Sequence, residues 1–206
     1  AEDAIRDSVA SRGLGDVYKR QLLHGYGSDE NDLFSFAEYL PKKYTIISLR
    51  APFETPMGGY CWFSINFNNS NEKWSDHKQA YQSILNLESQ IDFFIQKYNL
   101  EPDLIDLLGF SQGAVLSWAL LLDFSIKINR AVCLSGYIDK SLLKEDIYSY
   151  RDIIAYSSHG INDPVIPFDW AKTSIESLKE NNPNVPISIS EQIDVSYTHL
   201  TLPTKA

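Results

Sequence analysis

A serine between two glycines, in Gly109-Phe110-Ser111-Gln112-Gly113, has a spacing that suits nucleophilic chemistry. An apolar run of strand length precedes it and an apolar run of helical length follows it. This context predicts a strand, a tight turn and a helix, with Ser111 at the turn. Glycine is needed on both sides because strand and helix approach so closely there that a Cβ would collide. The turn would expose the Ser111 hydroxyl to a histidine; a purely structural tight turn is the alternative.

The segments that must position Ser111 alternate between strand-like and helix-like patterns. Helices are expected at about residues 30–40, 77–98 and 168–179, and strands at residues 44–49, 131–136, 153–157 and 185–190, besides the strand that leads into Ser111. Strands that are apolar throughout and separated by helices or loops are typical of a parallel sheet covered on both faces. The expected fold class is therefore α/β, with a mostly parallel central sheet and helices on both faces.

The two ends of the chain differ from its middle. Residues 1–20 show neither periodicity nor an apolar run, yet they lead into a turn that a buried strand should precede. Only Leu22 and Leu23 are available for that strand, so we expect it to be cut short. Residues 7–21 and 195–206 resemble translated adapter sequence, so both ends, residues 1–21 and 195–206, are interpreted as foreign, with natural disordered tails as the alternative. A single domain, incomplete at both ends, is then expected at residues 22–194.

Composition and charge narrow the class of partner. A chain of 206 residues with 44% hydrophobic and 22% charged residues suits one globular domain with a sizeable core. The net charge of −9 argues against nucleic acid, because a protein that binds the phosphate backbone needs a surplus of Lys and Arg on one face. A small-molecule substrate is therefore a better expectation than a nucleic acid.

The cysteines bear on the cellular compartment, and the absence of metal-ligand and phosphate-binding motifs bears on the cofactors. Cys61 and Cys133 lie far apart, and Cys133 falls in an apolar strand-like run, so both are interpreted as reduced thiols rather than a disulfide. No run approaches the roughly 18 apolar residues of a membrane span. We expect a cytoplasmic protein, although a foreign N-terminus would hide a signal peptide. The chain carries neither a metal-ligand cluster nor a glycine-rich phosphate cradle, so no cofactor is expected.

Six short motifs connect these features to a known family. They are His24–Asp29, Arg50–Pro52, Gly59 with Trp62-Phe63, Gly109–Gly113, Leu134–Gly136, and His159-Gly160 with Asp163–Pro167. In this order they resemble the carboxylesterase/phospholipase family of α/β-hydrolases, which includes acyl-protein thioesterases. The resemblance covers about Leu22 to Val195. It implies an α/β-hydrolase fold and hydrolysis of carboxylic esters or thioesters, with serine, aspartate and histidine in that chain order.

The resemblance also implies a role for individual residues. Ser111 is the expected nucleophile, and Asp163 is the acid that orients the base. The expected oxyanion donors are the backbone amides of Gln112, which follows the nucleophile, and Tyr26, in the loop after the first core strand. For Asp163 the alternative is a plain turn, because Asn162-Asp163-Pro164 is good turn chemistry in its own right.

The general base is where the chain departs from the family. The family places it in a Gly-His pair roughly thirty to thirty-five residues after the aspartate, but no Gly-His follows residues 185–190 here. His199 has nearly suitable spacing, yet it lies in the foreign-looking tail. His24, His77 and His159 are expected to be structural or solvated. We therefore expect the catalytic histidine to be missing and the chain as printed to turn over poorly.

Substrate preference rests on an aromatic segment. Residues 52–74 carry seven large apolar side chains among Gly, Asn and Ser, which suits an aromatic-walled loop over an acyl or aryl pocket, with Trp62 and Phe63 in contact with substrate. The alternative is that these side chains pack a long loop onto the domain. The leading hypothesis is a serine hydrolase of the esterase, thioesterase or lysophospholipase type. The competing hypothesis is a noncatalytic α/β-hydrolase-fold binding protein that lacks a base.

Overall fold

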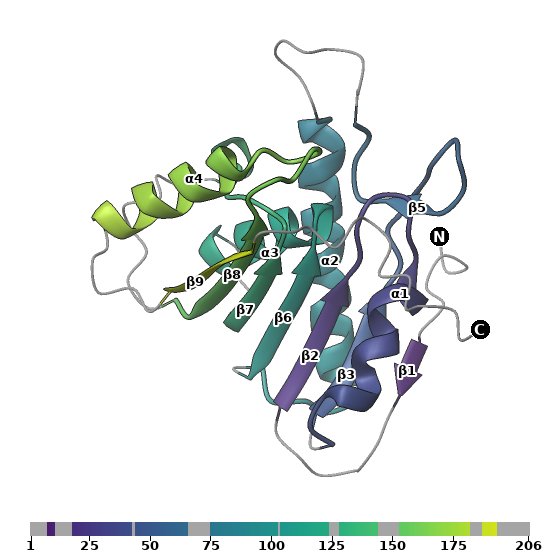
Figure 1. Ribbon diagram of the computed structural model, residues 1–206. Helices are drawn as coiled ribbons and strands as arrows, with labels where there is room; N and C mark the ends of the chain where they lie inside the picture. The colour runs from purple at the N-terminus through teal and green to yellow at the C-terminus, as the bar shows by residue number, and fades with distance from the viewer. Residues whose placement is uncertain are drawn as a thin grey trace, which may run out of the picture.

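The central feature of the fold is a seven-stranded sheet with the order β1-β3-β2-β6-β7-β8-β9 (Figure 1). The computed structural model describes residues 8–10, 18–42, 44–65, 75–102, 104–123, 128–143, 153–181 and 187–192. The strands are β1 (Ser8–Ala10), β2 (Tyr18–Leu23), β3 (Tyr44–Leu49), β6 (Ile105–Phe110), β7 (Ile128–Leu134), β8 (Ala155–Gly160) and β9 (Ile187–Gln192). Only β1 runs antiparallel to its neighbour among these, so the sheet is mostly parallel, as predicted.

Helices cover both faces of the sheet, which confirms the predicted α/β class. They are α1 (Glu30–Phe34) with the 3₁₀ turn η2 (Ser35–Tyr39), α2 (His77–Lys97), α3 (Gln112–Asp123), the 3₁₀ turn η3 (Lys140–Leu142) and α4 (Phe168–Asn181). A short hairpin, β4 (Phe53–Glu54) and β5 (Tyr60–Cys61), stands apart from the main sheet. Within the described residues, no helix is long and apolar enough to cross a membrane.

Two hydrophobic clusters lie on opposite faces of the sheet. Leu22 and Leu23 are adjacent on β2 and point to opposite faces, and each is fully buried in a different cluster. The smaller cluster joins Leu22 to Leu33 of α1. The larger one includes Leu23 and side chains of α2, α3 and α4. α1 therefore covers one face, and the main core lies on the other.

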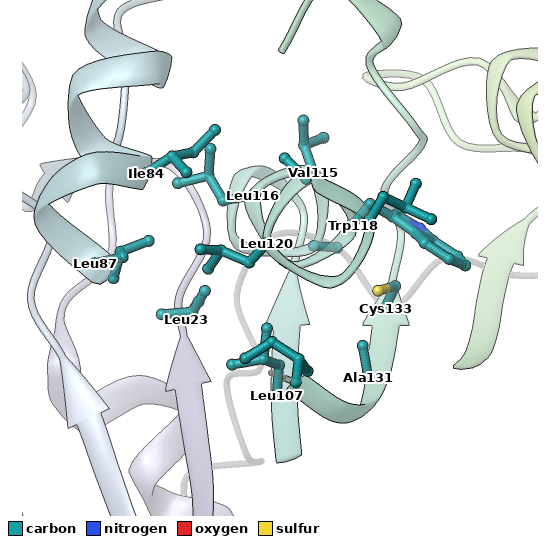
Figure 2. Close-up of a cluster of buried hydrophobic side chains, with 14 of the residues drawn as sticks. Leu23, Ile84, Leu87, Leu107, Val115, Leu116, Trp118, Leu120, Ala131 and Cys133 are labelled. Atoms are coloured by element: carbon teal, nitrogen blue, oxygen red, sulfur yellow. The ribbon is translucent and has the colours of Figure 1, made fainter. Parts of the chain in front are cut away.

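The helix α3 lies inside the main core, because it is apolar on nearly every side. Figure 2 shows Leu116 of α3 facing Ile84 of α2, while Trp118 lies on the side of Cys133 in β7. Both cysteines are buried and free, which confirms the prediction of unpaired thiols. This burial fixes the axis of the helix that begins directly after Ser111.

The prediction that only Leu22 and Leu23 form the first core strand is wrong. β2 begins at Tyr18 and pairs in parallel with β3 on one side and β6 on the other. Backbone hydrogen bonding to both neighbours therefore outweighs the polar composition of Tyr18-Lys19-Arg20-Gln21. Lys19 is buried and donates from Nζ to the Glu101 carbonyl at 2.9 Å. That residues 1–21 and 195–206 are foreign stays a prediction, and the tail lies outside the described residues.

Candidate active site

Three of the predicted site segments lie at the same edge of the sheet. The loop with Tyr26 follows β2, Ser111 follows β6, and the loop with Asp163 follows β8. These strands are parallel, so their carboxyl ends lie together at the edge where α/β proteins bind ligands. β2 neighbours β6, and a Cβ placed on Gly25 would lie 3.4 Å from the Ser111 Cβ. The loop of Tyr26 therefore contacts the serine turn directly.

The predicted strand, tight turn and helix around Ser111 are confirmed. Ser111 has φ +53°, a left-handed conformation that a side chain rarely adopts. A Cβ on Gly109 would lie 2.3 Å from the Gly113 carbonyl oxygen. A Cβ on Gly113 would lie 2.0 Å from the carbonyl oxygen of Leu23 on β2. Close backbone approach thus requires both glycines, and Ser111 lies between them with a left-handed backbone.

Neighbouring backbone groups hold the strained turn in place. The Ser111 amide donates to the Leu134 carbonyl of β7 at 2.9 Å. The Ser111 carbonyl accepts from the amides of Ala114 and Val115 at 3.0 and 3.1 Å. A left-handed serine persists only where the surroundings determine its backbone in this way.

The loop after β2 is fixed by the β4–β5 hairpin. Gly27 has φ +76°, and its amide donates to the Tyr60 carbonyl at 2.8 Å. The Tyr60 amide donates back to the Ser28 carbonyl at 2.7 Å. A Cβ on Gly59 would lie 2.1 Å from the Gly27 carbonyl oxygen, so hairpin and loop are in backbone contact. The pairing therefore ties the position of the loop to that of the hairpin.

An ion pair that the sequence did not reveal supports the same loop. Arg50, at the end of β3, binds the buried carboxylate of Glu30 at the start of α1, and its guanidinium lies 4.6 Å from the centre of the Tyr60 ring. Burial disfavours the charged form of Glu30, but the hydrogen bonds from Arg50 outweigh burial and lower its pKa. Arg50-Ala51-Pro52 was visible as a motif, but nothing in the sequence indicated Glu30 as its partner.

The two predicted oxyanion donors belong to the two segments that contact each other at Ser111. Gln112 is the first residue of α3, so its amide N–H has no acceptor within the helix and lies at the positive end of the helix dipole. Tyr26 directly follows Gly25, which packs against Ser111. That both N–H groups converge on one oxyanion stays a prediction.

Trp62 and Phe63 lie in the core. Both side chains are only 2% exposed and belong to the main cluster. Their backbone is bound by the Gln112 side chain, whose Oε1 accepts from the Trp62 amide at 3.0 Å and whose Nε2 donates to the Phe63 carbonyl at 2.6 Å. This placement favours the packing alternative over direct contact with substrate. Phe67 and Trp74 of the same segment lie outside the described residues.

Asp163 is both a turn residue and an ionised carboxylate. Its Oδ1 accepts from the amides of Val165 and Ile166 at 2.8 and 2.9 Å, and Oδ2 lies 3.4 Å from Nε2 of His159. Burial alone would raise its pKa, but the hydrogen bonds from His159 and the two amides lower it below the ordinary value. Asp163 thus has the negative charge that a residue orienting the base needs. It also forms the turn that the alternative interpretation of Asn162-Asp163-Pro164 predicts.

The three described histidines have structural partners. Nε2 of His24 accepts from the Ala51 amide at 3.0 Å, so the proton resides on Nδ1, which donates to the Gly25 carbonyl at 2.7 Å. Burial lowers the pKa of His24 and keeps it neutral. Nε2 of His159 donates to the Ile166 carbonyl at 2.9 Å, and His77 contacts Ser141 on the surface. None of these rings is hydrogen-bonded to Ser111 within the described chain; His199 lies outside it.

Comparison with known proteins identifies relatives of this chain. A family model described as phospholipase/carboxylesterase matches residues 21–199. Acyl-protein thioesterase 1 of Debaryomyces hansenii is 30% identical over 171 residues, which is 75% of this chain and 73% of the relative. The family match extends past the predicted domain boundary at residue 194 and includes His199.

Solved structures share the same fold. Esterase PE8 superimposes with a TM-score of 0.75 at 22% identity, covering 89% of this chain and 87% of the esterase. The carboxylesterase of Bacillus cereus superimposes with a TM-score of 0.73 at 18% identity, covering 90% of this chain and 84% of that one. These likenesses establish the α/β-hydrolase architecture that was predicted.

Proposed function

Because the chain belongs to the phospholipase/carboxylesterase family, we propose that it hydrolyses small carboxylic esters or thioesters through an acyl-enzyme at Ser111. The family match and the acyl-protein thioesterase relatives indicate a hydrolase of esters or thioesters. The observation that carries the assignment to Ser111 is its left-handed backbone at the end of β6, between two glycines whose close contacts exclude any side chain.

The reaction has two acyl-transfer steps. The Ser111 oxygen attacks the substrate carbonyl while a histidine takes the hydroxyl proton, and the carbonyl oxygen becomes an oxyanion. The amides of Tyr26 and Gln112 donate to that oxyanion. Collapse of the intermediate expels the alcohol or thiol, which receives the proton, and leaves Ser111 acylated. Water then repeats the sequence and releases the acid.

Asp163 orients the imidazolium and stabilises its charge. Its lowered pKa keeps it anionic at neutral pH, and Oδ1 is fixed by two backbone amides. One oxygen is thereby occupied, and Oδ2, beside His159, has lone pairs for a second donor. The role proposed for Asp163 is therefore compatible with the turn that it forms.

The base is proposed to follow β9, because β9 pairs with β8, the strand that precedes Asp163. In the printed chain His199 is the one histidine after β9. The prediction that the native base is missing, and that this chain is a weak catalyst, belongs to the same proposal. Esterase, thioesterase and lysophospholipase activity all fit, since they share one acyl-enzyme chemistry.

The first experiment tests the nucleophile. Wild-type protein and the variants Ser111→Ala and Ser135→Ala are treated with a fluorophosphonate and with p-nitrophenyl acetate, and acyl or phosphonyl adducts are counted by intact mass. Ser135 is the matched control, because it directly follows the neighbouring strand β7 and has φ +52°. Adduct on wild type and Ser135→Ala but not on Ser111→Ala is expected. Equal adduct on Ser111→Ala would refute the proposal, and no adduct on any of them would favour the noncatalytic binding protein.

The second experiment tests the base and the acid with the same esters. If a histidine serves as the base, Asp163→Asn is expected to lower acylation strongly, since the neutral amide cannot stabilise an imidazolium, whereas a chain without its base should respond little to this substitution. If His199 serves as the base, His199→Ala lowers the rate to the level of an enzyme without a base. An unchanged rate in His199→Ala would support the prediction that this chain lacks its histidine.

A further inference from the structure

A single buried tryptophan links the two segments that carry the proposed oxyanion donors. Trp62 makes hydrogen bonds to α3, to α2 and to the end of β2. We propose that Trp62 is a positioning residue, which sets the separation between the amides of Tyr26 and Gln112. This inference rests on the proposed function and adds a residue that acts through Gln112 and His24.

The link to Gln112 runs through the side chain of Gln112 itself. Gln112 is 1% exposed, and both polar atoms of its side chain bind the Trp62-Phe63 backbone, at 3.0 and 2.6 Å. A carboxamide held at both ends cannot rotate freely, so the residue that carries the amide donor is tied to the position of Trp62. The first turn of α3 is thereby fixed from the side as well as along its axis.

The link to Tyr26 runs through His24. The Trp62 indole N–H donates to the His24 carbonyl at 2.8 Å, and the two rings lie 5.3 Å apart between centres. His24 in turn accepts from Ala51 through Nε2 and donates to the Gly25 carbonyl through Nδ1. The Trp62 indole therefore fixes His24, and His24 in turn fixes the Gly25 carbonyl, which belongs to the peptide bond that leads into Tyr26.

Trp62 is itself anchored. The hydroxyl of Ser83, on α2, donates to the Trp62 carbonyl at 2.6 Å. Backbone amide, backbone carbonyl and indole N–H of one residue thus bind three different segments. Displacement of the indole would move the His24 peptide relative to Gln112, and misplacement of catalytic donors by about 1 Å can cost on the order of 10²-fold in rate.

Packing alone does not account for this arrangement. Trp118 is equally buried in the same core, but its indole N–H has no hydrogen-bond partner among the described residues. A buried tryptophan can therefore be accommodated here without such a bond. The indole bond of Trp62, by contrast, is made to His24, in the segment that leads to Tyr26, while its backbone amide is bound by Gln112.

The contrast between the two tryptophans supplies a matched test. Trp62→Phe removes ring volume and the hydrogen bond to His24, whereas Trp118→Phe removes ring volume alone. The readout is the saturating rate of Ser111 acylation by p-nitrophenyl acetate, separated from the half-saturating concentration. Acylation depends on the oxyanion donors even where no base assists, since a triad enzyme lacking one member keeps about 10³-fold catalysis or more over water.

Trp62→Phe is expected to lower the saturating acylation rate by about tenfold or more, with a half-saturating concentration within about twofold of wild type. Trp118→Phe is expected to keep the rate within about twofold at a comparable loss of thermal stability. Gln112→Met serves as a second variant, because it removes the other link and leaves the backbone amide in place. Trp62→Phe and Gln112→Met together should lower the rate by less than the product of their separate effects.

The outcomes separate the two proposals. Equal acylation rates in Trp62→Phe and Trp118→Phe, or a change confined to half-saturation, would overturn the positioning role while the serine chemistry stands. If Trp62→Phe does not fold, a wild-type rate in Gln112→Met overturns it. Wild-type protein that is not acylated at Ser111 would overturn the proposed function and, with it, this inference.

Discussion

Replacing Gln21 by leucine is expected to stabilise the protein. Gln21 lies in the middle of β2 and is 2% exposed. Its register partners are Ile47 on β3 and Leu107 on β6, and both belong to the main core. The side-chain oxygen Oε1 is buried and has no hydrogen-bond partner within the described residues. A polar group is therefore enclosed where the two flanking strands present apolar side chains.

The magnitude follows from two opposing effects. A buried acceptor without a partner costs about 1–3 kcal/mol, and leucine removes that cost. Leucine is one heavy atom smaller, and a gap of that size costs up to about 1 kcal/mol. The free energy of unfolding of Gln21→Leu should therefore rise by about 1–2 kcal/mol. For a chain of this length that corresponds to an increase in Tm of about 2–8 °C.

Gln112→Leu is the matched control, because Gln112 is as deeply buried but both of its polar atoms are paired. Its loss leaves the Trp62 amide and the Phe63 carbonyl without these partners, so the free energy of unfolding should fall by about 2–4 kcal/mol. Urea unfolding followed by circular dichroism, with the m-value checked for constancy, measures both variants. A Gln21→Leu protein that is destabilised like Gln112→Leu would refute the reasoning.

Three further outcomes are expected. Ser111→Gly should be about 1 kcal/mol more stable than Ser111→Ala in urea, because alanine keeps the left-handed strain that glycine relieves, and Ser135→Gly against Ser135→Ala should show the same sign. Gly113→Ala should lose about 3 kcal/mol in urea unfolding, since its Cβ would lie 2.0 Å from a carbonyl oxygen, and a loss under 1 kcal/mol would contradict that contact. By NMR titration of the imidazole protons, His24 should titrate below about pH 6.5 and His159 above it, and the reverse order would contradict the hydrogen-bond assignments.

The histidine titrations carry opposite consequences for stability. Burial lowers the pKa of His24, so its contribution is complete above about pH 6.5 and is lost as the pH falls through its folded pKa. Burial also disfavours charge on His159, but Asp163 and the Ile166 carbonyl outweigh it and raise the pKa. The contribution of His159 is therefore complete below about pH 6.5 and is lost as the pH rises through its folded pKa.

The strand and helix around Ser111 were predictable because local signals agree there. An apolar strand, two glycines and an apolar helix each specify the same turn, and tertiary contacts reinforce it. β3 was predicted with the bounds that the structure has, residues 44–49. β3 and β6 are buried on both faces, and their apolar composition is enough to predict that burial.

β2 and the aromatic segment were less predictable because their structure depends on distant partners. Tyr18 to Gln21 have polar side chains, yet two neighbouring strands supply their backbone hydrogen bonds. The aromatic character of Trp62 suits either a pocket wall or a core. It is hydrogen-bonded to residues 24, 83 and 112, which lie in three separate segments. No sequence motif indicates that these segments lie close together.

The general base is decided by reach as well as by spacing. β9 ends at Gln192 and lies three strands from β6, a lateral distance of about 14–15 Å at 4.8 Å per strand. His199 is seven residues beyond Gln192, and seven extended residues span up to about 24 Å. Chain length therefore permits His199 to reach Ser111, and the family match includes it, whereas its sequence context resembles a foreign tail. His199 is thus either the general base or part of a foreign tail. A lowered acylation rate in His199→Ala would indicate a complete triad, and an unchanged rate would indicate a serine without its base.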